Sequence, residues 1–430
     1  MAKAAKPDAT TREDGSEESQ AIGRRARAAA RALAATTSNA KNAALVAMAA
    51  ALRSSADAIL KENAADVAAA GAAGLSAALI DRLTLNRDRL DKTARGIDEI
   101  AAFRDPVGEI IEGYTRPNGL QIMRLRVPLG VVLTIYESRP NVTGDVAALC
   151  LKSGNAAILR GGKESLRSNL AIHKALAEAV TSQGLPADAL QMIGNPDHDF
   201  LAALLHEDRF IDVVIPRGGE ALIRAVAEQS TIPVIKHYKG VCHVYVDELG
   251  DLDMAEAICF NAKVQRAATC NAMETMLVHK NVAARFLPRI CRRMAEAGVE
   301  LRGDERTRRL WPKARPATEE DWFAEYLDLV LSIRVVDDIQ EAIDHIARYG
   351  SGHTDAIVSA DLQHVQQFVR DVDSSSVMVN TSTRFSDGGE YGLGAEVGIS
   401  TDKLHARGPM GVRDLTTYKW VVYGNGQLRT

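Results

Sequence analysis

Apolar residues in the first quarter of the chain recur with the spacing of α-helices. From about Ala21 to Arg104 the sequence is rich in alanine, and no run in it has the composition of a strand. The pattern predicts two or three helices, broken at Gly71 and Gly74 and ending before Pro106. Residues 1–20 have mixed charge and no apolar core, which predicts a disordered tail rather than a signal peptide.

The next pattern is that of a β-hairpin. Glu109–Tyr114 and Ile122–Val127 flank the turn sequence Pro117-Asn118-Gly119. In the second arm, apolar residues alternate with arginines, as in a half-buried strand. A protruding hairpin of this kind often serves as an assembly arm, and an ordinary surface hairpin fits the pattern equally well.

After the hairpin, short apolar runs alternate with helical patterns. The first block has expected strands at Val131–Ile135, Ala156–Leu159, Leu190–Ile193, Val213–Ile215 and Pro233–Ile235, and helices at Ser165–Val180 and Gly219–Glu228. A second block runs from about Met254 to Asn380, with expected strands at Thr275–Val278, Leu329–Val335, Ala356–Val358 and Val377–Val379. The chain ends in the strand-like Lys419–Tyr423. This alternation predicts an α/β fold with doubly wound parallel sheets.

Composition narrows the function classes. With 430 residues, 46% of them apolar, the chain is long enough for two or three packed domains. The formal charge of −4 gives no sign of a nucleic-acid partner, and the longest apolar run is too short to span a membrane. Five scattered cysteines fit neither a disulfide framework nor a zinc motif, so we expect a reducing, cytoplasmic compartment.

Two glycine segments stand where a strand leads into a helix, at Ile158–Lys163 and Val214–Gly219. Backbone amides at a helix amino terminus bind anions, and glycines allow close approach of a phosphate. Simple glycine turns are the alternative, but two such segments on consecutive βα units favour phosphate binding. The GxGxxG fingerprint of dinucleotide-binding proteins is missing. The candidate cofactor-binding residues are Arg160, Gly161, Gly162, Lys163, Pro216, Arg217, Gly218 and Gly219.

One of the five cysteines stands in a context that favours reactivity. Cys270 lies in the polar segment Lys263–Asn271, directly before an expected strand, with Lys263 and Arg266 nearby to favour a thiolate. The other four cysteines lie in apolar or helical patterns, where a buried structural role is the default.

A second polar loop, Ile135–Val142, leaves an expected buried strand. In α/β sheets such loops carry ligand groups. Asn141 could donate its side-chain N–H to a developing oxyanion, and a turn role beside Pro140 is the alternative. The ten histidines form no HxxxH or HxH pair, so we expect no metal site.

Long ordered segments of the chain, dense from about Leu75 onward, resemble the aldehyde dehydrogenase superfamily, and specifically its branch that reduces glutamyl phosphate in proline biosynthesis. They are Leu75–Leu83, Val127–Val132, Tyr136–Val142, Leu151–Ala156, Val214–Gly219, Pro233–His237, Val264–Ala272 and Asn380–Thr401. The resemblance implies an aldehyde dehydrogenase-like fold with two parallel-sheet domains and a small β region for oligomerisation. It implies an NADP-binding domain at 21–107 and 128–253, a catalytic domain at 254–385, and an oligomerisation arm at 108–127 and 386–430.

The resemblance also implies a reaction, in which NADPH reduces L-glutamate 5-phosphate to L-glutamate 5-semialdehyde and phosphate. Cys270 matches the family's nucleophile, Asn141 its oxyanion donor, and Glu325 the glutamate that meets the nicotinamide ribose. A cationic substrate site is expected, with Arg139, Arg266 and His237 as candidates. The substrate would come from glutamate 5-kinase, and the enzyme would be a homodimer or homotetramer.

One departure from the wider superfamily favours reduction over oxidation. Oxidising aldehyde dehydrogenases carry a glutamate that activates water to hydrolyse the thioester, and Lys236 aligns with that position. A reductase has no use for this base, because hydrolysis would waste the acyl-enzyme. The remaining alternatives are a hydrolytic aldehyde dehydrogenase, against which Lys236 argues, and a non-catalytic relative, against which Cys270 argues.

Overall fold

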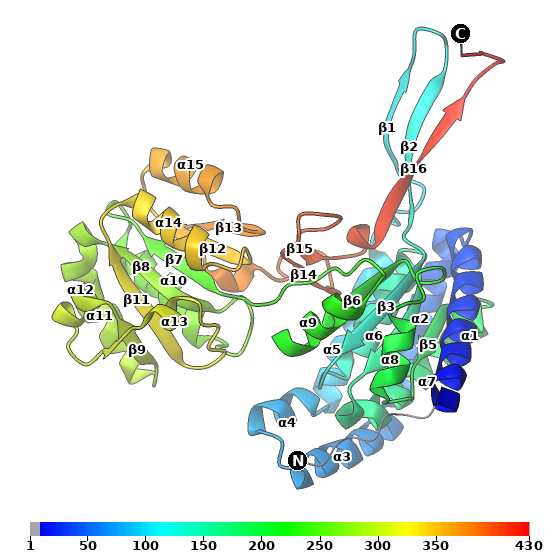
Figure 1. Cartoon of the computed structure of the whole chain (residues 1–430), viewed down its shortest axis with the longest axis horizontal. Helices are drawn as coiled ribbons and strands as arrows, with labels where there is room; N and C mark the ends of the chain where they lie inside the picture. Colours follow the sequence, from blue (N-terminus) through cyan, green and yellow to red (C-terminus); the bar gives the residue numbers. More distant parts are fainter. Residues whose placement is uncertain (1–8, 430) are drawn as a thin grey trace. The chain divides into compact units, whose positions relative to one another are not determined.

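The computed structural model describes residues 9–429 and divides into two compact units (Figure 1). Unit 1 comprises residues up to 236, 392–398 and 410 onward, and unit 2 comprises residues 237–391 and 399–409. The chain crosses between them through the paired strands β14 (Gly398–Ser400) and β15 (Gly408–Met410). The boundary near residue 236 lies before the expected boundary at 253/254, because β7 (Cys242–Val246) pairs with strands of unit 2.

Unit 1 begins with more helices than the sequence pattern predicts. They are α1 (Ala9–Ala34), α2 (Ser38–Ser54), α3 (Ala56–Ala72), α4 (Ala77–Leu83) and α5 (Arg87–Ala102). The helix α3 runs through Gly71 and stops before Gly74, whose φ of +77° is the left-handed conformation that glycine adopts readily. The expectation of only two or three helices is therefore wrong, since short capped breaks divide the alanine-rich region further.

The expected disordered tail is wrong for the part of it that the structure describes. Helix α1 already begins at Ala9, and residues 1–8 lie outside the described residues. Ser19 is buried, and its hydroxyl donates to Glu207 Oε1 at 2.9 Å. The apolar residues that follow, Ile22 and Ala26, are buried as well, so packing stabilises a helix that local composition alone would not predict.

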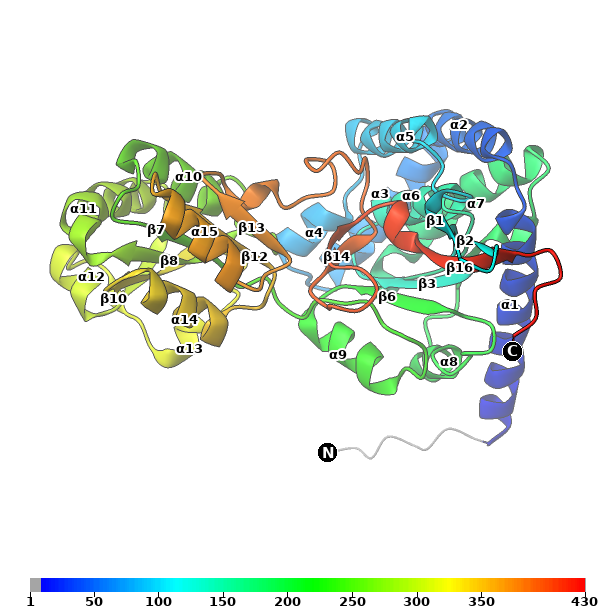
Figure 2. The same cartoon turned by 90° about the horizontal axis from the view of Figure 1, so that it is seen from above.

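The sheet of unit 1 is parallel and has the strand order β5-β4-β3-β6. Its strands are β3 (Val131–Tyr136), β4 (Ala156–Gly161), β5 (Leu190–Met192) and β6 (Val213–Arg217). The helices between them are α6 (Asn141–Lys152), α7 (Leu166–Ser182), α8 (His198–Leu204) and α9 (Glu220–Gln229). Figure 2 shows α6 and α7 on one face of the sheet and α8 and α9 on the other. The expected strand Pro233–Ile235 is reduced to a single bridge between Val214 and Val234.

An antiparallel three-stranded sheet projects from unit 1 as an arm (Figure 1). The hairpin β1 (Ile110–Thr115) and β2 (Gln121–Pro128) turns at Gly119, which has a φ of +87°, and pairs with β16 (Thr416–Tyr423). The predicted hairpin and the predicted terminal strand are thus confirmed as elements. The register places β16 beside β2, so β1 and β16 are the two edges of the arm.

Unit 2 contains a seven-stranded parallel sheet with the strand order β10-β9-β11-β8-β7-β12-β13. Besides β7, its strands are β8 (Met273–His279), β9 (Glu300–Gly303), β10 (Arg315–Pro316), β11 (Val330–Val336), β12 (Thr354–Val358) and β13 (Ser376–Val379). Its helices are α10 (Leu252–Val264), α11 (Lys280–Glu296), α12 (Glu305–Leu310), α13 (Glu319–Trp322), α14 (Ile339–Tyr349) and α15 (Leu362–Asp371). The predicted fold class, doubly wound parallel sheets, is confirmed.

Aspartates fix where several of these helices begin. Asp251 accepts hydrogen bonds from the backbone N–H groups of residues 253 and 254. Asp338 caps α14 and Asp361 caps α15 in the same manner. Each carboxylate satisfies amide donors that have no partner within the helix and complements the positive end of the helix dipole.

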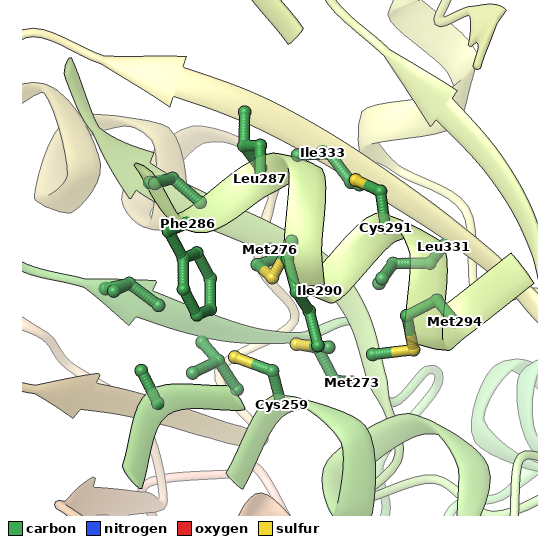
Figure 3. Close-up of a cluster of buried hydrophobic side chains, with 14 of the residues drawn as sticks. Cys259, Met273, Met276, Phe286, Leu287, Ile290, Cys291, Met294, Leu331 and Ile333 are labelled. Carbon is green, nitrogen blue, oxygen red and sulfur yellow. The ribbon is translucent and has the colours of Figure 1, made fainter. Parts of the chain in front are cut away.

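The sheet of unit 2 has one apolar core on each face. Along β7, Val244 and Val246 enter the core beneath α10 and α11, whereas Tyr245 enters the core beneath α14 and α15. Since successive side chains of a strand point to opposite faces, a sheet covered on both sides favours apolar residues at successive positions. In Figure 3, Phe286 and Ile290 of α11 lie over the strands in the first of these cores.

In the part of the chain that the structure describes, no single helix is long and apolar enough to cross a membrane. Helices α2 and α3 meet the length and composition criteria only as a pair that bends by 64°.

Replacing Leu287 by alanine should destabilise unit 2 strongly. Leu287 lies on α11 and is fully buried against the sheet, and Leu→Ala changes in such cores cost about 2–5 kcal/mol of unfolding free energy. Urea unfolding followed by circular dichroism measures the change. The matched control is Leu404→Ala, which removes an 87% exposed leucine and should change stability by less than about 0.5 kcal/mol. Equal effects of the two substitutions would contradict the assigned core.

Candidate active site

Cys270 lies in a short turn at the amino-terminal end of β8. The turn is closed by a hydrogen bond from the backbone N–H of Ala272 to the carbonyl of Thr269, at 3.0 Å. The side-chain amide of Asn271 donates to the carbonyl oxygen of Ser386 at 2.9 Å, which ties the turn to the segment after β13. Cys270 is partly exposed and forms no disulfide. The turn therefore presents a thiol that solvent can reach from a backbone that neighbouring segments hold.

The backbone of Gly240 packs directly against Cys270. A Cβ atom added at Gly240 would lie 1.9 Å from the carbonyl oxygen of Cys270. The thiol of Cys242, two residues farther along, donates to the same carbonyl oxygen at 3.2 Å. No side chain fits between the two segments, so position 240 requires glycine.

Two histidines lie beside this turn. His237 Nδ1 is 2.8 Å from the carbonyl oxygen of Ile399, and the ring of His353 meets the ring of His237 edge to face, with centroids 5.4 Å apart. Each of His237, His353 and Cys270 offers one atom that could bind a metal, and these three atoms lie within 4.8 Å of one another. The predicted candidate His237 is thus close to Cys270, and His353 joins them from the loop before β12.

Cationic side chains make the surroundings of Cys270 electropositive. Arg384 donates through Nε to Gln265 Oε1 at 2.8 Å. Burial lowers the pKa of Arg384, the positive charge of Arg266 lowers it further, and Asp387 opposes both. Two neighbouring guanidinium groups can bind an anionic substrate.

The remaining four cysteines are buried, as their apolar sequence context predicts. Burial raises the pKa of the Cys150 and Cys291 thiols to about 12, and it raises the pKa of the Cys259 and Cys242 thiols as well. A buried thiol without a stabilising charge is a poor nucleophile. Among the five cysteines, Cys270 alone combines partial exposure with neighbouring cations.

The segment that contains Glu325 is fixed by a buried ion pair. Lys263 and Glu274 form a salt bridge with both side chains fully buried. Burial raises the pKa of Glu274 to about 7, and the other oxygen of this carboxyl accepts the backbone N–H of Leu327 at 3.2 Å. Leu327 has a φ of +52°, an unusual conformation for a residue with a side chain. The pair therefore holds Glu325 in the loop before β11.

Unit 1 presents a second group of candidate residues where β3, β4 and β6 end. The loop after β3 is tied to both neighbours, because Ser138 donates from N and Oγ to Glu164 Oε1, at 2.7 and 2.8 Å, and Glu137 Oε2 accepts the N–H of Gly219 at 3.0 Å. The strand order reverses at β3, because β4 and β5 lie on one side of it and β6 on the other, and α/β proteins bind ligands at such a switch point.

At three glycines around these loops, an added Cβ atom would displace a neighbouring side chain. A Cβ atom would lie 1.9 Å from Asn169 Nδ2 at Gly161, 2.2 Å from Glu164 Oε1 at Gly162, and 2.4 Å from Glu137 Oε2 at Gly218. At Gly219 a Cβ atom would meet nothing within 4 Å. Backbone without side chains is what a phosphate-binding loop needs, because the ligand must approach the amides closely.

The cations predicted to bind the cofactor differ in their surroundings. Arg160 donates to the carbonyl oxygen of Pro196 at 3.0 Å and is buried, so it stabilises the loop after β5. Arg217 forms a 3.6 Å ion pair with Glu396. Lys163 is exposed at the start of a 3₁₀ turn, Lys163–Ser165. Of the three cations, Lys163 is the one best placed to contact a phosphate, and Pro216 lies within β6.

Asn141 is the first residue of α6 and is oriented by an acidic neighbour. Its Nδ2 atom donates to Asp145 Oδ2 at 3.0 Å, one turn along the helix. An ionised carboxylate only accepts hydrogen bonds, so it directs the amide nitrogen of Asn141 towards itself. That nitrogen carries a second hydrogen, which can point to a ligand. Arg139 lies in the same loop, between β3 and α6.

The structure therefore places the predicted residues in two groups. Cys270, Arg266, His237 and Glu325 belong to unit 2, whereas Asn141, Arg139 and the glycine loops belong to unit 1. Sequence reasoning missed His353 and Arg384. No sequence motif marks His353. Arg384 lies within the segment Asn380–Thr401 that carries the family resemblance, and it could have been predicted as a further cation for the substrate.

The chain is similar to known proteins in both sequence and structure. The sequence profile of the aldehyde dehydrogenase family matches residues 4–309. The chain is 54% identical to γ-glutamyl phosphate reductase from Geobacter metallireducens, over 96% of this chain and 99% of that protein. It is 43% identical to the crystal structure of γ-glutamyl phosphate reductase from Thermotoga maritima, with a TM-score of 0.94 over 96% of this chain and all of that one. An acetylating aldehyde dehydrogenase from Geobacillus thermoglucosidasius shares the fold, with a TM-score of 0.69 at 16% identity over 98% of this chain and 99% of that one.

The surroundings of Asp145 predict a pH dependence of stability. Burial raises the pKa of this carboxyl from 3.8 to about 6, although Asn141 and Arg217 oppose the shift and Glu396 adds to it. The native state then holds more protons than the unfolded state between about pH 4 and 6, so stability falls as pH rises through that window, by ~3 kcal/mol in total.

Replacing Asp145 by asparagine should remove this dependence. Between about pH 5 and 7.5, the unfolding free energy of the variant relative to wild type should rise by about 1–2 kcal/mol, measured by urea unfolding at each pH. Asp57→Asn, at an exposed aspartate, is the control and should leave the difference constant over this range. If the difference in unfolding free energy between Asp145→Asn and wild type also stayed constant with pH, the proposed burial of the Asp145 carboxyl would be contradicted.

Proposed function

Since this chain belongs to the aldehyde dehydrogenase family, and within it to the γ-glutamyl phosphate reductases, we propose that it reduces L-glutamate 5-phosphate to L-glutamate 5-semialdehyde and phosphate, with NADPH as the reductant, in proline biosynthesis. The observation that carries the proposal is Cys270, partly exposed in a fixed turn beside two cationic side chains, in a chain 54% identical to such a reductase over nearly its full length. The family resemblance of the sequence is thereby confirmed.

The residues of unit 1 fit a nicotinamide dinucleotide. Gly161, Gly162 and Gly218 keep side chains out of the loops after β4 and β6, and Lys163 adds an exposed positive charge. These loops would hold the phosphates of the cofactor, and Glu325 would bind its nicotinamide ribose. When bound, NADPH supplies the hydride that reduces the thioester carbonyl. A preference for NADPH over NADH is part of the proposal.

Cys270 is the nucleophile in the proposed reaction. Its thiolate attacks the carbonyl carbon of the acyl phosphate, and the tetrahedral oxyanion accepts hydrogen bonds from the backbone N–H of Cys270 and the side chain of Asn141. The carbon–oxygen bond to phosphate then breaks and leaves a thioester on Cys270. Phosphate is a good leaving group, so this step needs no strong general acid. After reduction the thiohemiacetal collapses, releasing the aldehyde and the Cys270 thiolate.

Cations bind the doubly anionic substrate. The phosphate and the α-carboxylate of the substrate both need positive partners, and Arg266 and His237 lie near Cys270 in unit 2. We add Arg384 to the predicted candidates because it is half-buried beside Arg266 and Cys270. Arg139 of unit 1 remains a proposed substrate ligand.

A hydrolytic aldehyde dehydrogenase is the alternative function. It would need a carboxylate base to activate water against the thioester, and the aligned position carries Lys236. An ammonium group cannot serve as that base while it is protonated. Lys236 therefore favours reduction of an acyl phosphate over hydrolysis of a thioester, and a requirement for phosphate in the assay distinguishes these two functions.

We further propose that the arm joins copies of this chain into a homodimer or homotetramer. Register places Tyr114 and Val422 opposite Ile122, and Trp420 opposite Arg124, so these side chains share one face of the arm. Tyr114, Trp420 and Val422 are about half exposed, which is unusual for a contiguous apolar face unless a partner covers it. The β1 and β16 edges also offer unpaired backbone groups to another strand.

The cellular setting follows from the same proposal. Glutamate 5-kinase is the class of enzyme that makes the acyl phosphate, and we propose it as the supplier of the substrate. All five cysteines are free, which suits the reducing cytoplasm and preserves the reactive thiol.

The reaction should depend strictly on phosphate in the reverse direction. With glutamate semialdehyde and NADP, steady-state formation of NADPH should require inorganic phosphate, because phosphate must cleave the thioester. Absorbance of NADPH measures the rate. Sustained turnover without phosphate would indicate hydrolysis and contradict the proposal.

Cys270→Ala should abolish this turnover, by at least about 10⁴-fold, and leave the circular dichroism spectrum unchanged. Cys291→Ala is the matched control, since it removes a buried cysteine far along α11 and keeps an apolar side chain. A Cys270→Ala enzyme with wild-type activity would rule out covalent catalysis.

Trp420→Asp should weaken assembly through the arm. The substitution places a charge on the exposed apolar face, and sedimentation velocity at micromolar concentration should show a shift towards monomer. Leu428→Asp is the control, because Leu428 is 87% exposed and lies beyond the end of β16. An unchanged oligomer in Trp420→Asp, or a monomeric wild type, would contradict the role of the arm.

A further inference from the structure

Three potential metal ligands meet at the site of the proposed nucleophile. One nitrogen of His237, one nitrogen of His353 and the sulfur of Cys270 all lie within 4.8 Å of one another. The three residues stand on the segment before β7, the loop before β12 and the turn before β8. No short-range motif links them, so only the fold reveals the cluster.

Hydrogen bonds orient both imidazole rings. His237 Nδ1 faces the carbonyl oxygen of Ile399 at 2.8 Å, and because a carbonyl only accepts, Nδ1 carries a proton and Nε2 is the nitrogen that can bind a metal. His353 Nδ1 lies 2.9 Å from the hydroxyl of Thr354. A zinc-bound histidine usually donates its other ring N–H to a carboxylate, a backbone carbonyl or water, and His237 has such a partner in Ile399.

The ligand set selects a particular kind of metal. One thiolate and two imidazoles suit Zn²⁺, whereas Mg²⁺ and Ca²⁺ prefer oxygen ligands. Tetrahedral zinc has bonds of about 2.0–2.3 Å, so its ligand atoms lie about 3.5 Å apart, and small side-chain rotations would close the cluster by ~1 Å. Three protein ligands leave a fourth position for water.

The surroundings set the expected strength of binding. Arg266 and Cys270 both lie close enough to Arg384 to affect its pKa. The positive charges of Arg384 and Arg266 oppose the approach of a dication to Cys270. A site with three ligands and neighbouring cations should bind zinc reversibly rather than as a permanent structural ion.

We propose that His237, Cys270 and His353 form a reversible Zn²⁺ site that blocks the nucleophile. On binding, the thiol of Cys270 loses its proton to the buffer, a zinc–sulfur bond forms, and the sulfur lone pair is no longer available for attack. No oxidation or reduction takes place. The inhibitory consequence rests on the function proposed above, whereas metal binding itself does not.

Zinc binding is measured on the reduced full-length enzyme, freed of thiol reductant, in a buffer without phosphate. ZnCl₂ is titrated in competition with a chromogenic chelator, and the rate at which iodoacetamide alkylates Cys270 is followed by peptide mass spectrometry. We expect about one high-affinity Zn²⁺ per chain, and slower alkylation of Cys270 in Zn²⁺ than in Mg²⁺.

Variants locate the site. His353→Ala and His237→Ala should each raise the zinc dissociation constant by at least about tenfold, since even outer-shell partners of zinc ligands contribute that much. His206→Ala is the matched control and should bind as wild type does, because His206 is an exposed histidine whose Nδ1 also meets a backbone carbonyl.

Two results would overturn the proposal. One is zinc that binds wild type without protecting Cys270 from alkylation, a result that needs no variant to fold. The other is unchanged zinc affinity in both histidine variants. A protein that binds zinc as expected but lacks reductase activity would leave the site intact and refute only the proposed function. An active reductase whose Cys270 is alkylated equally fast with and without zinc would refute the zinc site and leave the proposed function intact.

Discussion

The position of the Cys270 thiol, the proposed nucleophile, depends on the close contact between the backbones of Gly240 and Cys270. There is no room for a Cβ atom at position 240, and the Cys242 thiol bonds to the carbonyl that Gly240 touches. Hydrogen bonds from Asn271 anchor the other side of the turn. The thiol is thus held by main-chain packing, which fixes it more firmly than a flexible surface loop would and leaves its sulfur exposed to a substrate.

The parallel sheet of unit 2 makes this contact possible. Cys270, His353 and Glu325 all precede strands of one sheet, so the amino-terminal ends of β8, β12 and β11 bring together residues that lie far apart in sequence. Apolar cores on both faces hold those strands in register. The thiol, the histidines and the cationic side chains therefore stand on a rigid base, which is what both the proposed acylation and the proposed zinc site require.

Most of the strands could be predicted, because buried parallel strands are short apolar runs with clear boundaries. Two features of the helices could not be predicted, because tertiary packing decides them. They are breaks such as the one at Thr37 and the helical conformation of residues 9–20. The reactivity of Cys270 was suggested by its polar context and by the family motif. His353 could not be predicted as a site residue, because it meets Cys270 and His237 only through the folding of separate strands into one sheet. Asn141 and the glycine segments were expected after strands, where ligand sites are usual, whereas Cys270 was expected directly before a strand, and His353 lies before another strand of unit 2.

The most direct test of the account is whether Cys270 carries the acyl group. The full-length enzyme is mixed with glutamate semialdehyde and excess NADP in the absence of phosphate, quenched, and digested for mass spectrometry. We expect a burst of about one NADPH per chain, with a glutamyl thioester on the peptide that contains Cys270. A burst with no adduct on Cys270, or with the adduct on another residue, would contradict it.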